Sequence, residues 1–394
     1  MSLASIRNHL YTVPGLIPAT RARFIHHAHK PWRRPPSQIL QGRCTLWHTL
    51  WSDVYSNPRY AELVPRLDTL FFAPIRQRDG ILGRVDGAIV RRTRFIEERT
   101  LEWYRRCGLH VLLTPTPKQA ALFRGPVVVD LDDPSPTADE RAAFRAGNIR
   151  SVIVTTNAIG RYVQESNPDL DVTVIPQGVD LERAFNARHE HTRRAILSRL
   201  SLPLDTVIVG YHAPIICISS DTKSQANIPR TFYADVLISA IQRLWLDGLS
   251  FVVLLVGKPS RAICELARSE PRLVLSGYVE RDQLFDWVGA FDIGTYPRTI
   301  DFHGRESVKL LEYMANSAAV LAMRTSETTF LDKTASGLLA NDANEFYERL
   351  RRLIIDRDER DGLASRGRTI VKDRDWNKLA AHYDRLLAAF AEAA

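Results

Sequence analysis

The sequence predicts an α/β protein with two Rossmann-like domains that face a cleft. Three observations support this fold class. Short, continuous apolar runs recur along the chain, and each is followed by a segment at helical spacing. A polar, helical stretch at 177–204 divides these runs into two series, and 394 residues are enough for two or three domains. Continuous β-branched runs of this kind are typical of parallel sheets covered on both faces.

The predicted elements follow the chain in this order. The first series places strands at 110–115, 126–134, 149–156 and 171–176, with helices at 137–147 and 158–167. The second places strands at 206–212, 250–257, 272–278, 290–297 and 318–323, with helices at 230–247, 259–269, 280–288 and 306–316. Helices at 342–356, 358–371 and 376–393 end the chain. Before residue 109 the pattern predicts strands within 9–24 and at 69–74, a loop at 30–38 and a helix at 91–108.

The composition is that of an ordinary globular protein, with 45% apolar and 25% charged residues. No apolar run approaches the ~18 residues of a membrane span, and the first thirty residues lack the order of a signal peptide. The four cysteines are scattered and include no CxxC pair, which indicates free thiols in a reducing compartment. We therefore expect a cytoplasmic location.

The first sixty residues are strongly basic, with eight Lys or Arg against one acid, Asp53. Such a block suits an anionic partner such as phospholipid headgroups, a lipid-linked phosphate or nucleic acid, although a solvated basic surface explains it equally well. No zinc finger, RRM signature or helix-turn-helix pattern accompanies the charge, so we do not expect nucleic acid. Peripheral contact with the inner face of a membrane and a solvated basic surface therefore both stay open.

Cations gather in the segments that follow the strands of the second series. In open α/β sheets, ligands bind outside the carboxyl ends of the strands. These segments hold Lys223, Arg230, Lys258, Arg298, Arg305 and Lys309, and the helix expected at 306–316 begins near Ser307. Free N–H groups and the dipole at a helix N-terminus favour a phosphate. The pattern predicts an anion site at this edge.

Glu312 raises a separate question within this helix. At about 100° per residue, Val308, Leu311 and Ala315 share one face, and Glu312 lies beside it. The carboxylate can point to solvent, pair with Lys309 three residues earlier, or accept hydrogen bonds from both hydroxyls of a ribose whose phosphates rest at the helix tip. The residues alone leave these alternatives open.

The second half of the chain resembles the retaining GT-B glycosyltransferases of family four. "SVKLLEYMANSAAVLAM" is similar to their donor-site segment, S-P-x-K-L-x-E-Y-M-A-x-G-x-P-V-V-A. "VTVIPQGVD", "FVVLLVGKP", "LVLSGYVERDQLFDWVGAFDIGTYP" and "DWNKLAAHYDRLL" follow the order of the family's other conserved segments. The resemblance covers residue 109 to the end. It implies an acceptor domain at 1–180, a donor domain at 181–375 and a final helix, 376–394, that returns to the first domain.

The resemblance also implies roles for individual residues. Glu312 would bind the donor ribose, while Gly304 stands where the family has its first motif acid and Glu306 is out of register. Lys223, with Arg230 second, would neutralise the diphosphate and act in catalysis. The other expected donor-binding residues are Ser307, Val308, Lys309, Arg305, His303, Arg298, Gly257 and Tyr278. The expected acceptor-binding residues are Gly15, Arg21, Arg23 and Asp130. His212 and His303 lie in expected loops, and a lone loop histidine is more often solvated than functional. His303 is adjacent in sequence to Gly304 and could touch the donor.

The implied reaction is transfer of a hexose from a nucleoside-diphosphate sugar to a glycan or lipid-linked acceptor, with retention at the anomeric carbon, as in polysaccharide and cell-envelope biosynthesis. No metal is expected, because cations and the helix dipole can stabilise the leaving diphosphate. The acids of "DLDD" (130–133) have no His or Cys nearby and suit helix capping better. Alternatives are a GT-B isomerase or phosphorylase, or a non-catalytic protein that binds a glycan or a partner, which Gly304 favours. No G-x-G-x-x-G follows a strand, so a NAD-dependent oxidoreductase is not expected.

Overall fold

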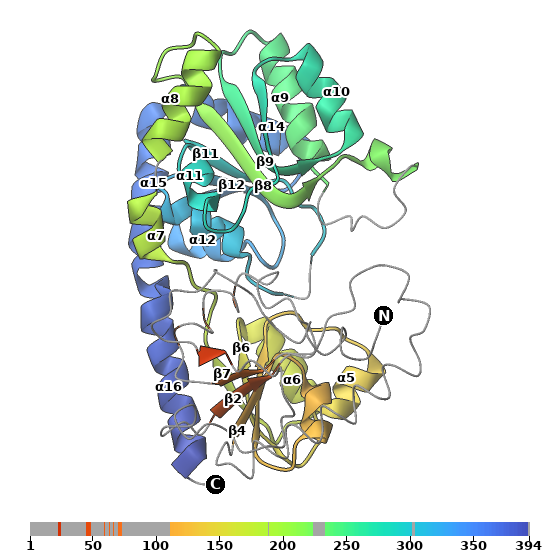
Figure 1. Ribbon diagram of the computed structural model, residues 1–394. Coiled ribbons are helices and arrows are strands. Elements are labelled where there is room, and N and C mark those ends of the chain that lie inside the picture. The colour runs from red at the N-terminus through yellow and green to blue at the C-terminus, as the bar shows by residue number, and fades with distance from the viewer. Residues whose placement is uncertain are drawn as a thin grey trace, which may run out of the picture. The chain divides into compact units, whose positions relative to one another are not determined.

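The computed structural model describes residues 23–24, 45–48, 59, 63, 66, 70–72, 111–187, 189–223, 233–301 and 304–392. Its contacts divide the chain into two compact units, Met1–Pro176 with Trp376–Ala394, and Gln177–Asp375. The sequence analysis put the divisions after residues 180 and 375. Each unit contains a parallel sheet with helices on its faces, so the predicted fold class of two Rossmann-like domains is confirmed (Figure 1).

The strands described in the first unit form one parallel sheet in the order β1-β3-β2-β4-β5-β6-β7. They are β1 (Arg23–Phe24), β2 (Thr45–His48), β3 (Leu70–Phe72), β4 (Val111–Thr114), β5 (Val127–Leu131), β6 (Ile149–Val154) and β7 (Asp171–Val174). The helices are the 3₁₀ helix η4 (Pro117–Leu122), α5 (Ala138–Ala143) and α6 (Asn157–Ser166). Threonine hydroxyls cap both α-helices, as Thr137 accepts from the Glu140 amide and Thr156 from the Ile159 amide.

The two faces of this sheet are buried by different elements. Val127 and Val129 of β5 pack with α5 and α6. Val128, between them, packs with the C-terminal helix α16 (Trp376–Glu392). Alternate residues of one strand therefore reach opposite cores, which explains the continuous apolar run. The predicted return of the final helix to the first unit is confirmed.

The second unit contains a parallel sheet in the order β10-β9-β8-β11-β12-β13. Its strands are β8 (Ile208–Ile216), β9 (Val252–Pro259), β10 (Leu273–Gly277), β11 (Ile293–Tyr296), β12 (Ala319–Met323) and β13 (Gly337–Ala340). Its α-helices are α7 (Leu181–Asn186), α8 (His189–Arg199), α9 (Asp235–Leu246), α10 (Arg261–Ser269), α11 (Leu284–Val288), α12 (Val308–Ala315), α13 (Phe330–Thr334), α14 (Ala343–Ile355) and α15 (Arg357–Val371). The 3₁₀ helices are η5 (Ser219–Lys223) and η7 (Lys372–Arg374).

The faces of the second sheet are covered in the same alternating way. Side chains of α9 and α14 share one core with Val253 and Leu255 of β9. Side chains of α11 and α12 share the other core with Val252 and Leu254. Figure 1 shows α12 beside β11 and β12, which it connects. The N-terminus of α12 follows the carboxyl end of β11, the edge where the sequence predicts a ligand.

Some elements differ from the prediction. Strand β8 continues to Ile216 rather than ending at 212, with a register shift between His212 and Ile215. Helix α9 begins at Asp235 rather than 230, and β2, α13 and β13 were not predicted. The predicted helix at 91–108, the loop at 30–38 and most of the segment 9–24 lie outside the described residues. Among the helices that the structure describes, none is both long and apolar enough to cross a membrane.

Candidate functional site

Glu312 lies on α12 with its side chain fully buried. The helix connects β11 to β12 and packs on the sheet that they form, and the neighbours of Glu312 in sequence, Leu311 and Tyr313, are also buried. A carboxylate in such a place costs several kcal/mol unless cations or donors meet it. The alternative in which Glu312 points to solvent is therefore wrong.

Two residues from other strand ends meet this carboxylate. Arg281, four residues after the end of β10, donates from Nη1 to Glu312 Oε1 at 2.6 Å. His212 Nε2 lies 2.9 Å from Glu312 Oε2, without the alignment of a regular hydrogen bond. Burial raises the pKa of Glu312, but Arg281 and then His212 outweigh it and bring this pKa down to about 2. Glu312 is thus an ionised carboxylate inside the fold.

His212 differs from its expected environment. The sequence analysis took it as a loop residue that is more often solvated, but it lies on β8 and is buried. Its ring packs edge-on against Tyr313, with the centroids 5.3 Å apart. Burial lowers the pKa of His212, and the attraction of Glu312 offsets this only in part. At neutral pH the imidazole is therefore uncharged beside the carboxylate.

Lys309 supplies a cation one turn before Glu312. The two side chains are not an ion pair, so the alternative in which Glu312 pairs with Lys309 is wrong: the Glu312 oxygens lie against Arg281 and His212 instead. Among the described residues no carboxylate lies within ion-pair distance of the half-buried Lys309. Burial and then the charge of Arg305 bring the pKa of Lys309 down to about 8.

Arg298 completes the positive side of the site. It follows β11, is buried, and donates from Nη1 to the Tyr296 hydroxyl at 3.0 Å and to Glu327 Oε2 at 3.4 Å. The Tyr296 hydroxyl also donates to Glu327 at 2.8 Å. Burial raises the pKa of Glu327, and the charge of Arg298 lowers it in part. Arg305, half-buried in the loop before α12, lowers the pKa of Lys309 through its charge.

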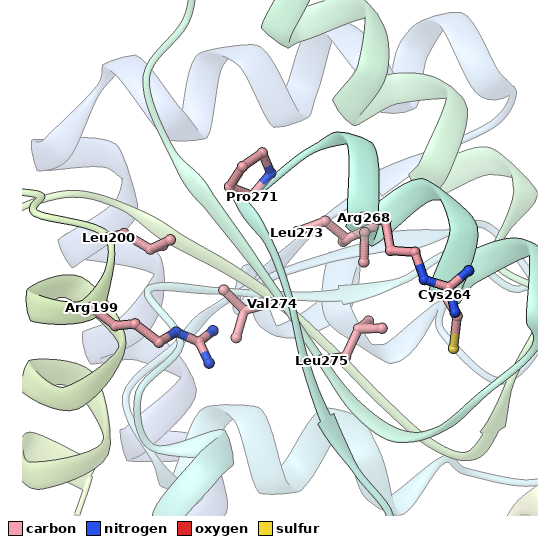
Figure 2. A pocket seen from close by; sticks show the side chains of 9 residues that line it. Arg199, Leu200, Cys264, Arg268, Pro271, Leu273, Val274 and Leu275 are labelled. Atoms are coloured by element: carbon pink, nitrogen blue, oxygen red, sulfur yellow. The ribbon is translucent and has the colours of Figure 1, made fainter.

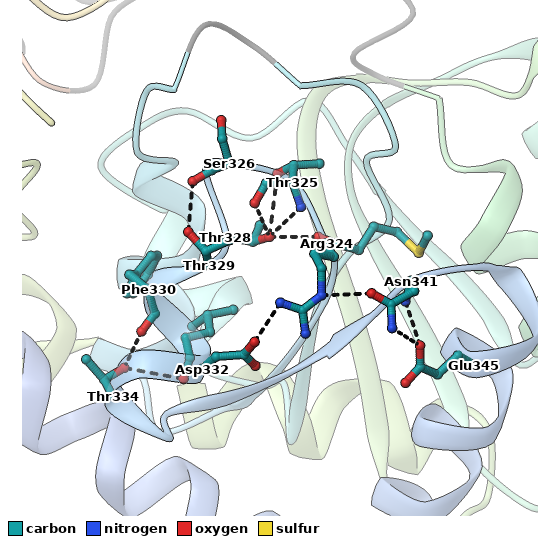
Figure 3. Close-up of polar contacts among 12 residues, drawn as sticks. Arg324, Thr325, Ser326, Thr328, Thr329, Phe330, Asp332, Thr334, Asn341 and Glu345 are labelled. Carbon is teal, nitrogen blue, oxygen red and sulfur yellow. Dashed lines mark hydrogen bonds and ion pairs between the residues drawn. The ribbon is translucent and has the colours of Figure 1, made fainter. Parts of the chain in front are cut away.

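The loop that carries Glu327 is held firmly from within. Thr328 donates its hydroxyl proton to Met323 O at 2.9 Å and accepts from the Thr325 amide at 2.9 Å (Figure 3). Behind it, Arg324 pairs with Asp332 at 2.6 Å. These contacts fix the carboxyl end of β12. The loop can therefore hold Glu327 against Arg298 with little loss of conformational freedom.

Gly304 and Glu306 lie at and near the position of the family's first motif acid. Gly304 has no side chain to replace that acid, and its φ of +73° is a backbone conformation that favours glycine. Glu306 is buried and accepts from Arg374 Nη1 at 2.8 Å and from the Gln177 amide at 3.2 Å. The Glu306 carboxylate is therefore bonded to residues near both chain ends of the second unit, which spans Gln177–Asp375.

The remaining residues expected at the donor surround this group. Ser307 is the N-cap of α12, but its hydroxyl makes no capping hydrogen bond, and Val308 is half-buried. Gly257 lies on β9 with φ of +142°, and a Cβ there would lie 1.8 Å from Ala213 O. Tyr278, directly after β10, is 66% exposed. The strand ends therefore bring Glu312, Lys309, Arg298 and Gly257 to one edge of the sheet.

Other predicted residues are placed only in part. Gly15, Arg21, Arg230 and His303 lie outside the described residues. Arg23 is in β1 and Lys223 in η5, and only the backbone of each is described. Their roles stay predictions.

Asp130, predicted at the acceptor, is fully buried in the first unit. Arg59 Nη2 lies 3.0 Å from its Oδ1, and the Tyr383 hydroxyl donates to the same oxygen at 2.9 Å. Arg59 also donates to the carbonyls of Ile175 and Pro176. These contacts assign Asp130 a structural task within the first unit, and its contact with an acceptor stays a prediction.

The sequence analysis missed Arg281. The strand-end rule selected only residues 277–278 after β10, although this cation stands a few residues further along the same connection. A search for any Lys or Arg between a strand end and the next helix would have found it. In the described part of the chain, no group of three or more His, Cys, Asp or Glu is arranged to hold a metal ion. The expectation of a metal-independent reaction stays a prediction.

A shallow pocket of about 400 Å³ lies elsewhere in the second unit, beside the edge strand β10 (Figure 2). It is lined by Arg199, Leu200, Cys264, Ala267, Arg268, Pro271, Leu273, Val274 and Leu275. It touches the first three residues of β10 rather than its carboxyl end, and none of the predicted site residues lines it. Ligands of open α/β sheets bind outside the carboxyl ends of the strands, so we do not place the donor in this pocket.

Comparisons with known proteins bear on the family and the fold. Residues 227–356 match the family described as Glycosyl transferases group 1. No curated protein sequence matches the chain.

Solved structures share the fold at low identity. Sucrose-phosphate synthase from Thermosynechococcus elongatus has a TM-score of 0.68 at 16% identity, covering 89% of this chain and 100% of that one. Anabaena HepE in complex with UDP-glucose has 0.60 at 14%, covering 88% and 99%. A UDP-forming trehalose-phosphate synthase from Burkholderia xenovorans has 0.60 at 10%, covering 89% and 99%. The family match over residues 227–356 and the shared fold confirm the predicted resemblance to GT-B glycosyltransferases.

Proposed function

We propose that the protein transfers a hexose from a nucleoside-diphosphate sugar to a glycan or lipid-linked acceptor, with retention at the anomeric carbon. The single observation that supports this most is the ionised, fully buried carboxylate of Glu312 on the helix whose N-terminus follows the carboxyl end of β11. Lys309, Arg298 and Arg305 surround that N-terminus with positive charge. An anion site and a hydrogen-bond acceptor for ribose are thus combined on one helix.

In this proposal Glu312 accepts hydrogen bonds from the ribose hydroxyls. Each carboxylate oxygen can accept two hydrogen bonds, so Oε1 keeps an acceptor position beside Arg281. Because the Glu312 side chain is fully buried, the ribose reaches it only if Arg281 shifts. Arg281 is 24% exposed and can move toward solvent at modest cost. Its guanidinium would then lie close to the incoming diphosphate.

The cations near α12 carry the catalytic step. When the glycosidic bond to the donor breaks, negative charge grows on the leaving diphosphate. Lys309, Arg298 and the dipole of α12 stabilise this charge, and we propose that Lys223 and Arg230 add to it. This arrangement can neutralise the diphosphate without a metal ion. The nucleotide is proposed to be uridine diphosphate, because HepE was solved in complex with UDP-glucose and the trehalose-phosphate synthase is UDP-forming.

The first unit and the basic first sixty residues are proposed to receive the acceptor. Eight Lys or Arg against one acid suit a lipid-linked phosphate at an anionic membrane surface. Gly15, Arg21, Arg23 and Asp130 remain the proposed acceptor-side residues. A location at the inner face of the membrane follows from the same charge.

A thermal-shift screen tests the donor site. Sugars linked to UDP, GDP, ADP and dTDP are each added to the full chain, and at a hundredfold excess over Kd the bound donor should stabilise it by about 2.7 kcal/mol. We expect the UDP sugars to give this shift. Proton NMR of the first sugar released by slow donor hydrolysis then reports the anomeric configuration, which we expect to be retained.

The alternative is a non-catalytic GT-B protein that binds a glycan or a partner. The absence of an acid side chain at Gly304 favours it, since Glu306 is engaged with Arg374 and Gln177. Binding of a UDP sugar without release or transfer of the sugar would support this alternative. No shift with any of the four nucleotide sugars would contradict the proposed donor site altogether.

A further inference from the structure

We infer that Glu306 is a positioning residue that ties the loop before α12 to both segments by which the chain passes between its two units. The chain leaves the first unit at Pro176–Gln177 and returns to it at Asp375–Trp376. Glu306 directly precedes Ser307, the N-cap of α12. It therefore stands in sequence at the proposed diphosphate site and makes its side-chain contacts at the two passages.

The two passages are bonded to each other inside the second unit. The Val179 amide donates to Arg374 O at 2.8 Å, and Val179 pairs with Asp375 as an isolated parallel bridge. Arg374 Nη1 also donates to Gln177 O at 3.3 Å. A displacement of one passage is therefore transmitted to the other.

Glu306 joins this pair of segments through a buried ion pair. Its Oε2 accepts from Arg374 Nη1 at 2.8 Å and from the Gln177 amide at 3.2 Å, so one oxygen contacts both passages. The Glu306 side chain is 6% exposed and that of Arg374 is 23% exposed. Charge-assisted hydrogen bonds in such a setting are short and well directed. They link the backbone of 304–307 to residues 177–179 and 374–375.

The consequence is a coupling between ligand and passages. A diphosphate held at the N-terminus of α12 restricts the loop 304–307, and Glu306 extends that restriction to both passages. Coupling between two sites is reciprocal, so the conformation of the passages also sets the affinity of the loop for the diphosphate. The link within the protein stands on geometry alone, whereas the ligand step rests on the proposed function.

Hydrogen exchange measured by mass spectrometry on the full chain tests the link without a ligand. Glu306→Ala should speed exchange at least tenfold in two peptides at once, one that covers 177–181 and one that covers 304–311. Glu306→Gln should restore most of the protection, because its carbonyl oxygen can still accept both hydrogen bonds. Glu265→Gln, which removes an exposed pair with Arg261 on α10 of the same unit, should change neither peptide.

A change in only one of the two peptides, or in neither, would overturn the inference. If Glu306→Ala does not fold, Arg374→Lys replaces it, since the ammonium keeps the charge but loses the planar pair of donors. It should loosen the same two peptides.

Adding UDP tests the coupling. In the wild-type chain, UDP should slow exchange in both peptides. In Glu306→Ala it should slow exchange only in the peptide 304–311. The Kd of UDP should rise about tenfold in Glu306→Ala and less than threefold in Glu306→Gln. Protection of 304–311 but not of 177–181 in the wild type would contradict the coupling. If UDP protects neither peptide, the proposed donor site fails, and the ligand-free comparison still decides the role of Glu306.

Discussion

Two fully buried carboxylates, one in each unit, show how differently a protein can use the same pair of groups. In the first unit Asp130 meets Arg59, and in the second Glu312 meets Arg281. Both cations are guanidinium groups within 3.0 Å of an oxygen. Burial raises the pKa of Asp130 more than Arg59 lowers it, whereas the cation beside Glu312 prevails and lowers that pKa.

The cations differ in their surroundings. Arg59 is fully buried and donates to two backbone carbonyls and to the Tyr383 hydroxyl. Its Cζ also lies over the ring of Trp376, 5.6 Å from the ring centroid. Arg281 keeps contact with solvent. A carboxylate whose cation is enclosed serves the packing of a core. One whose cation can withdraw remains open to a ligand.

The largest expected effect separates the stabilities of the two pairs. Arg59→Met should lower the free energy of unfolding by about 3–5 kcal/mol, because it leaves the buried Asp130 carboxylate without its cation. Arg281→Met should cost about 1–2 kcal/mol, because Arg281 is partly exposed and water can solvate the Glu312 carboxylate in its place. Urea denaturation of the two variants and the wild type measures both values. Equal losses would contradict the distinction between an enclosed and an accessible cation.

Removing the charge of Glu312 should affect binding more than folding. Glu312→Gln should weaken the binding of UDP-glucose by about 2 kcal/mol, or roughly 30-fold in Kd, because charged acceptors bind hydroxyls more strongly than neutral ones. Isothermal titration calorimetry measures the change. Glu265→Gln, which removes an exposed pair with Arg261 on α10, is the matched control and should leave Kd unaltered. An unchanged Kd in Glu312→Gln would show that this carboxylate is structural, like Asp130.

The smallest expected effect is a dependence on pH. With a pKa of about 8, Lys309 is charged at lower pH and loses its charge as the pH rises through 8, so the Kd of UDP-glucose should increase by up to roughly tenfold between pH 7 and pH 9. Glu312, with a pKa of about 2, does not titrate in this range. Lys309→Arg stays charged and should give a flat profile. A wild-type profile as flat as that of the variant would remove Lys309 from the donor site.

The strands were predictable where the chain buries both faces of a sheet. The runs 127–129 and 251–256 are apolar without interruption and rich in valine, and β5 and β9 contain most of them. The missed strand β13, "GLLA", begins with a glycine and has no β-branched residue, and the missed strand β2, "TLWH", ends in a histidine. Strands β4, β7 and β11 are equally short and were predicted, so the residue pattern rather than the length decides which strands a sequence reveals.

The site was predictable along α12 and much less so across the sheet. The position of Glu312 beside an apolar stripe raised the question of its burial without answering it, and the structure shows the side chain buried. Its partners come from β8 and from the connection after β10, far away in sequence. Helical periodicity relates residues a few positions apart. It contains no information on which strand end lies opposite, so Arg281 was missed and His212 was placed in solvent.

Attempts to redesign the sugar-nucleotide preference should treat two neighbouring strand ends very differently. The backbone oxygen of Ala213 occupies the space that any side chain at Gly257 would need, so libraries that randomise this codon will mostly yield chains that do not fold. Tyr278, largely open to water, tolerates diversity. Mutagenesis that spares the first position and samples the second would concentrate its variants among proteins that can still be assayed.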